Sequence, residues 1–175
     1  MLNVKEKSAV NNLPDLYNTD YYTWAMTNAE LLKEDKLDEI DYINLAEEVK
    51  DLGNSEYYRL VSFLANLLSH IYKWDNQPKL RTKGWKVTIL NSLLQIKNTI
   101  QKNPGLKSKI NEAFYDSWRQ SVSILLKDIK DDDIVDSIPY NNPYSLKQAI
   151  DKAHQIVSDK IDKKDILFIN NIVNL

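Results

Sequence analysis

Residues 56–75 read EYYRLVSFLANLLSHIYKWD, and this stretch decides the fold. Its apolar side chains recur every three or four positions, at Leu60, Phe63, Leu64, Leu67, Leu68, Ile71 and Trp74. Because an α-helix makes about 3.6 residues per turn, this spacing places them all on one face of a helix. The pattern predicts a central helix from about Glu56 to Asp75. Its apolar face, centred on residues 64–71, is expected to form the middle of the core.

Helical spacing also accounts for most of the remaining chain. The helices expected there run from Thr19 or Asp20 to Glu34, from Asp38 to Leu52, from Trp85 to Gln101, from Leu106 to Asp128 and from Ser145 to Ser158. Thr19 or Asp20 can cap the first of them, and Ser145 with Gln148 forms a capping box at the start of the last. The small serines on the apolar side of the helix over residues 106–128 allow a neighbouring helix to approach closely. Gly53 and Asn54 are suited to end the helix before the central one, since both tolerate the left-handed conformation that often follows a helix. The apolar residues between Ile166 and Val173 fit a helix and a strand equally well.

The composition agrees with a protein made of helices. The 175 residues match the size of one domain, and only 3 of them are glycines, which leaves little provision for turns with positive φ. We therefore predict an all-α fold, a single-domain bundle of five to six helices spanning residues 16–158. Residues 1–15 are expected to form a flexible N-terminus. Residues 159–175 are expected to form a C-terminal extension that packs on the domain or on a partner, and its conformation is left open between a helix and a short irregular or extended segment.

Signals for export, membrane insertion and thiol chemistry are missing from the sequence. The chain opens with Met-Leu-Asn-Val-Lys-Glu-Lys instead of a basic segment followed by an apolar one, and no apolar run approaches the roughly 18 residues of a membrane span. Without cysteine the chain forms neither disulfides nor a thiolate metal site. The sequence predicts a cytoplasmic protein that has no cofactor and does not enter a membrane.

The net charge of −2 hides a strong segregation of charge along the chain. Residues 1–60 carry 13 acidic and 6 basic side chains, residues 61–109 carry 1 and 9, and residues 110–175 carry 11 and 8. The simplest interpretation is that helices of opposite sign pack side by side. The alternative is a basic surface that binds nucleic acid, because the connector after the central helix places a tryptophan among cations. The residues concerned are Lys73, Lys79, Arg81, Lys83, Trp85 and Lys86.

One group of polar residues is a candidate site. On a helical wheel, His70 lies at the edge of the apolar face of the central helix, while Glu47 and Glu48 belong to the helix expected before it. A carboxylate could therefore pair with His70 across a helix–helix contact, either to orient the imidazole or to bind a metal, as in a metal-dependent hydrolase. A structural network is the preferred interpretation of the same residues. Asp151 and His154 form another close pair, on a later helix.

Several short segments resemble a known family. The matching segments are Leu16-Tyr17, Tyr21-Tyr22-Thr23-Trp24, Ala29-Glu30-Leu31-Leu32, Asn44-Leu45-Ala46-Glu47-Glu48-Val49, Leu52-Gly53, the run from Leu67 to Trp74, Gln77-Pro78, Trp85, and Pro143-Tyr144-Ser145-Leu146 with Gln148. Together they resemble the bacterial proteins called domain of unknown function 29 (DUF29), over about Leu16 to Ile150. The resemblance implies a helical single domain and no established activity. Gly84 departs from the pattern, because a serine commonly precedes the tryptophan there.

These observations favour an interaction protein over an enzyme. With two histidines and no cysteine, the chain has few groups for catalysis, and it lacks phosphate-binding loops and zinc-ligand spacings. We expect a small cytoplasmic helical module that binds an unidentified protein partner, and self-association is compatible with the sequence. The alternatives are a nucleic-acid-associated protein that uses the basic region 73–109 and a metal-dependent hydrolase centred on Glu47, Glu48 and His70.

Overall fold

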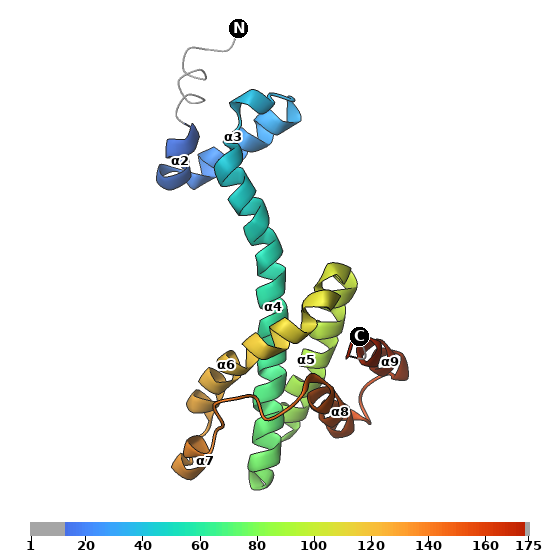
Figure 1. Ribbon diagram of the computed structural model, residues 1–175. Coiled ribbons are helices and arrows are strands. Elements are labelled where there is room, and N and C mark those ends of the chain that lie inside the picture. The colour runs from blue at the N-terminus through green and yellow to red at the C-terminus, as the bar shows by residue number, and fades with distance from the viewer. Residues whose placement is uncertain (1–12, 174–175) are drawn as a thin grey trace. The chain divides into compact units, whose positions relative to one another are not determined.

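The computed structural model describes the backbone of residues 13–173 and the side chains of residues 13–171 (Figure 1). Its α-helices are α2 (Leu13–Thr19), α3 (Tyr21–Lys33), α4 (Tyr42–Asn76), α5 (Lys83–Lys102), α6 (Ile110–Asp128), α7 (Asp132–Asp136), α8 (Leu146–Val157) and α9 (Lys163–Val173). Short 3-10 turns occupy Leu37–Glu39, Pro78–Leu80 and Pro104–Lys109. No strand occurs in these residues, so the all-α prediction is confirmed. The short helices α2 and α7 were not predicted, because they are too short to show a helical period.

The chain divides into two compact units, with the boundary between Asn54 and Ser55, inside α4. In the first unit, Trp24 is buried with Leu13 and Leu31 in a small core of its own. The Trp24 indole Nε1 donates to the Asp41 carboxylate (3.0 Å), and the Asp41 backbone N–H donates to the Asn28 side chain (2.9 Å). Because Asp41 directly precedes α4, these bonds hold the start of that helix against α3. The Asp20 cap predicted for α3 is confirmed by its bond to the Thr23 N–H (3.1 Å).

Helix α4 corrects the boundary that was expected at Gly53 and Asn54. The sequence predicted that one helix ends there and another begins, but α4 continues from Tyr42 to Asn76. Gly53 does not adopt a positive φ, and a Cβ at this position would meet no atom within 4 Å. A glycine inside a helix costs only about 1 kcal/mol relative to alanine. This cost is small, and α4 continues through Gly53.

The core of the second unit lies along the part of α4 that follows Ser55. Leu64, Leu67, Leu68 and Ile71 are all fully buried, so the predicted centre of the core is confirmed. Helix α6 comes close enough to α4 for the Ser121 hydroxyl to donate to the backbone carbonyl of Ala65 (3.0 Å). This approach requires a small side chain, and the serines of α6 had predicted it.

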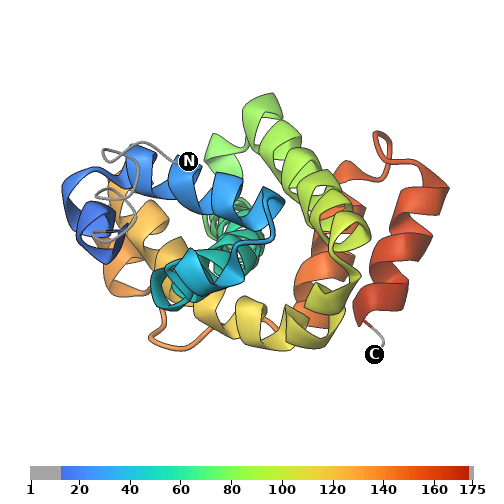
Figure 2. The same ribbon diagram turned by 90° about the horizontal axis from the view of Figure 1, so that it is seen from above.

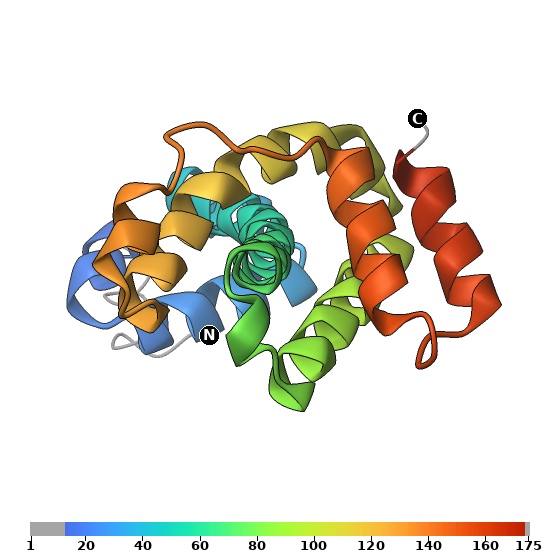
Figure 3. The same ribbon diagram turned by 90° about the horizontal axis from the view of Figure 1, so that it is seen from below.

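The C-terminal helices complete this unit. Helix α8 begins with the predicted capping box, in which Ser145 and Gln148 bond to each other's backbone N–H groups. Helix α9 settles the choice between helix and strand that the sequence left open, and it contacts both α5 and α8 (Figures 2 and 3). Lys97 of α5 and Asp165 of α9 form an ion pair (2.6 Å). None of the described helices is both long and apolar enough to cross a membrane.

Candidate functional site

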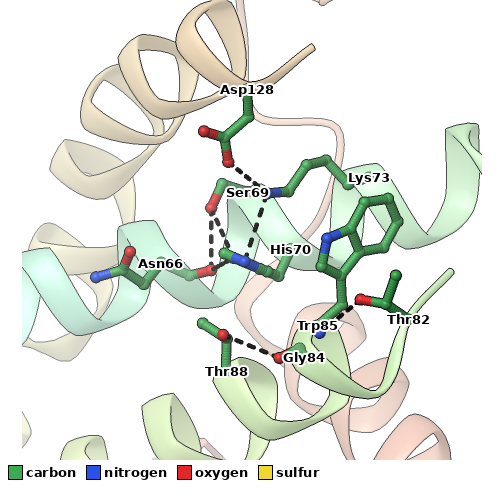
Figure 4. A network of polar contacts seen from close by, with 9 residues as sticks. All are labelled: Asn66, Ser69, His70, Lys73, Thr82, Gly84, Trp85, Thr88 and Asp128. Atoms are coloured by element: carbon green, nitrogen blue, oxygen red, sulfur yellow. Dashed lines mark hydrogen bonds and ion pairs between the residues drawn. The ribbon is translucent and has the colours of Figure 1, made fainter. Parts of the chain in front are cut away.

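His70 belongs to a polar network on the second half of α4 (Figure 4). Its Nδ1 lies 2.9 Å from the carbonyl oxygen of Asn66, and its Nε2 lies 3.4 Å from the Nζ of Lys73. A carbonyl can only accept a hydrogen bond and an ammonium group can only donate one. The proton of a neutral imidazole therefore sits on Nδ1, and Nε2 accepts from Lys73. Burial, followed by the nearby Lys73 charge, holds the pKa of His70 below its ordinary value.

Lys73 is the most buried charge of this network. Its Nζ binds the carboxylate of Asp128, the last residue of α6, at 2.5 Å, and it lies 5.3 Å from the centre of the Trp85 ring. The Lys73 side chain is only 4% exposed, whereas that of Asp128 is 43% exposed. Trp85 is positioned by the start of α5, where its backbone N–H donates to the Thr82 hydroxyl (3.3 Å). One ammonium group thus connects α4, α5 and α6.

Glu47 and Glu48 do not join this network. Both residues lie on α4 itself, so they cannot face His70 across a helix–helix contact, and the expected pairing rested on the wrong helix boundary. Glu47 pairs with Lys50 (3.1 Å). The Glu48 carboxylate accepts the hydroxyls of Tyr17 (2.8 Å) and Tyr21 (2.7 Å), and these bonds raise the pKa of both tyrosines.

In the later pair, Asp151 is held in an ion pair, whereas the buried Nε2 of His154 has no hydrogen-bond partner among the described residues. Asp151 pairs with Lys147 (3.1 Å), and burial lowers the pKa of His154. Within residues 13–171, no three histidine, aspartate or glutamate side chains come together as metal ligands would. These contacts give no support to the hydrolase alternative.

The basic region divides into two parts with different surroundings. Lys97, Lys102 and Lys109 each lie within 4 Å of a carboxylate, those of Asp165, Glu56 and Glu112 respectively. This part follows the expectation that opposite charges pack together. The remaining cations near the start of α5 have no carboxylate partner in the part of the chain that the structure describes; they are Lys79, Arg81, Lys83 and Lys86. The first three of them are exposed.

A groove that the sequence did not predict lies on the second unit. It has a volume of about 1050 Å³ and is formed by α4, α6, α7 and the connector after α7. Its lining is Tyr58, Val61, Tyr115, Asp116, Trp118, Arg119, Val122, Ser123, Leu126, Val135 and residues 138–142. The connector is fixed to α6 because the Trp118 indole donates to the Pro139 carbonyl (3.2 Å). Asp116 accepts the Tyr57 hydroxyl (2.6 Å), and burial with this bond raises the pKa of Tyr57.

A family match covers both surfaces. The sequence model of the family described as domain of unknown function DUF29 matches residues 16–155. The chain belongs to this family. The DUF29 match includes every residue that lines the groove and every unpaired cation near the start of α5, and it ends inside α8. The family's description names no reaction, ligand or partner. Among the curated proteins and the solved structures, none matches the chain.

The groove of this DUF29 protein could have been predicted from a pattern of side chains on α6. The core-facing row of α6 contains Phe114, Ser121 and Leu125. A second row on α6, Tyr115, Arg119, Val122 and Leu126, repeats at intervals of four, three and four. Two helical rows on one helix indicate two contact surfaces. The second row lines the groove.

Proposed function

We propose that this DUF29 chain is a cytoplasmic interaction module whose groove binds an apolar segment of a protein partner. The observation that supports the proposal is the exposure of large side chains along the groove. Tyr115 is 79% exposed and Tyr140 is 96% exposed, and Leu126 beside them is more than half exposed. Contiguous apolar patches of this kind mark binding sites more often than ordinary surface.

The chemistry of the lining fits a protein ligand. Tyrosine supplies a large contact area at a small cost in side-chain entropy and keeps a hydroxyl for hydrogen bonds, and arginine is the charged residue most enriched at interfaces. The groove presents both types, with Arg119 between Tyr115 and Val122 on the same face of α6. The Trp118–Pro139 bond ties the connector, which forms one wall, to α6, and this favours a surface that is formed before a partner binds.

A photocrosslinking amino acid at position 115 of the full chain tests this proposal in cells. The matched control carries the same crosslinker at Tyr22, which is 75% exposed, belongs to the first unit and is not among the residues that line the groove. We expect a discrete crosslinked protein from position 115 and not from position 22. The product should disappear when Leu126→Ser is added, because this change makes the apolar lining polar. Equal crosslinking from both positions, or none from position 115, would show that the groove is not the binding surface.

A further inference from the structure

The cations that lie over aromatic rings fall into two groups, those that also pair with a carboxylate and those that do not. Among the described residues, Lys73 lies over Trp85, Lys152 over Tyr144, and both Arg81 and Lys86 over Trp74. Lys73 and Lys152 also bind carboxylates, that of Asp128 at 2.5 Å and that of Asp75 at 2.9 Å. The two cations over Trp74 bind no carboxylate in residues 13–171. Of the described cations that lie over rings, Arg81 and Lys86 are therefore the two without a carboxylate partner.

Arg81 is held in a defined position. Its Nε donates to the Trp74 backbone carbonyl (2.8 Å), and its guanidinium carbon lies 4.9 Å from the centre of the Trp74 ring. These two contacts fix the plane of the guanidinium group while they use only one of its nitrogens. The two terminal nitrogens have no partner in the described part of the chain. A fork of this kind matches two oxygens of a phosphate group.

A second cation converges on the same ring. The Nζ of Lys86 lies 5.8 Å from the centre of the Trp74 ring, on a stretch of chain, residues 76–111, that contains no aspartate or glutamate. Two positive groups near one ring repel each other unless an anion lies near both. Lys79 and Lys83, each two residues from Arg81 along the chain, are also exposed and have no carboxylate partner among the described residues.

We propose that Arg81 and Lys86 bind phosphate groups of single-stranded nucleic acid, with Lys79 and Lys83 binding neighbouring phosphates. A polymer of phosphates suits four unpaired cations better than one free phosphate does. Because cations already lie over the rings of Trp74 and Trp85, the site binds the backbone and does not depend on base stacking. Binding should therefore show little preference for base sequence and fall steeply as salt rises.

Fluorescence anisotropy with a labelled oligothymidine of about 20 nucleotides tests the proposal, over a salt series of about 50–200 mM. Each phosphate contact to a single strand contributes about −0.7 to the slope of log K against log salt, so the double variant Arg81→Ala/Lys86→Ala should make the slope less negative by about 1.4. The matched control is Lys102→Ala/Lys109→Ala, which removes the same charge from two cations that pair with carboxylates. We expect the control to change affinity less than twofold. Arg81→Lys should keep the slope and weaken binding, since it keeps the charge and loses the fork.

Several results would overturn this inference. One is the absence of oligonucleotide binding at the lowest salt, and another is an equal loss of affinity in the control double variant. Another is competition by inorganic phosphate: if it displaces the labelled oligonucleotide as well as unlabelled oligonucleotide does at equal phosphate concentration, the site binds a small anion and not a nucleic acid. Stronger binding to vesicles of phosphatidylcholine and phosphatidylserine would identify a lipid surface instead. Circular dichroism of each variant checks that the helices are intact, and none of these changes touches the groove.

Discussion

Lys73 and Asp128 form an ion pair, and removing Lys73 should change the free energy of unfolding much less than removing Asp128 does. The Lys73 side chain is 4% exposed and that of Asp128 is 43% exposed. Each single substitution leaves the other charge without its partner. The cost then depends on whether water can reach the charge that remains. Because the ammonium group is buried and the carboxylate is not, losing the carboxylate should be the more damaging change.

The magnitudes follow from these exposures. Breaking a fully buried ion pair costs about 3–5 kcal/mol. Because Asp128 is partly exposed, water already screens part of its attraction to Lys73. We therefore expect Asp128→Ala to lower the free energy of unfolding by about 2 kcal/mol. Lys73→Met removes the buried charge and keeps a side chain of similar length, and the remaining carboxylate stays hydrated. It should cost less than about 1 kcal/mol. The double variant should consequently be more stable than Asp128→Ala alone.

Urea denaturation, followed by both tryptophan fluorescence and circular dichroism, measures these differences if the two transitions coincide. Lys109 and Glu112 form the matched control, because their side chains are 55% and 56% exposed. Substituting either one should change the free energy of unfolding by no more than about 0.5 kcal/mol. The reasoning fails if Lys73→Met costs as much as Asp128→Ala, or if the double variant is no more stable than Asp128→Ala.

Four further predictions concern α4, the core and the start of α5. Gly53→Ala should stabilise the chain by about 0.4–1 kcal/mol in urea, because its Cβ meets nothing; destabilisation would mean that the helix ends there. Leu67→Ala should cost about 2–5 kcal/mol and the exposed Leu167→Ala under about 0.5, measured as shifts of the urea midpoint. Because the pKa of His70 is lowered in the folded protein, its contribution to the free energy of unfolding is fully present above pH 6.5 and is lost as the pH falls below that value. In unfolding curves taken at a series of pH values, His70→Gln should therefore lose less stability on acidification than the unchanged protein. Lys83→Glu should raise the free energy of unfolding by about 0.3–1 kcal/mol and weaken oligonucleotide binding.

The sequence predicted the fold wherever the helical period was long and uninterrupted. The buried row of α4, the Asp20 cap and the Ser145 capping box followed from local rules, because caps and amphipathic rows depend on residues only a few positions apart. The error at Gly53 has the opposite origin. A glycine is typical of a helix end because it readily adopts positive φ, but Gly53 does not adopt it and lies inside α4.

The contacts of the candidate site were less predictable, because they depend on which helices meet. His70 was expected to contact Glu47 or Glu48, yet its partners are Asn66, Ser69 and Lys73, all within one turn of α4. The carboxylate that completes this network, Asp128, comes from α6, more than fifty residues away. No spacing rule connects residues at such a distance. Only the packing of α6 against α4 brings them together.

The charges on α5 distinguish stabilising cations from the proposed binding cations. Lys102 lies in the last turn of α5, where the helix dipole favours positive charge, and it lies 3.9 Å from Glu56. Lys83 and Lys86 lie at the opposite end, where the dipole disfavours positive charge, and the first turn has no acidic residue to compensate. Each such cation costs the free protein a few tenths of a kcal/mol, on the order of 0.3–1. A bound phosphate would reverse this cost, because it adds negative charge where the helix and its lysines are both positive. Lys83→Glu therefore separates the two roles: if it stabilises the chain and also weakens oligonucleotide binding, the lysine is retained for its ligand and not for the fold.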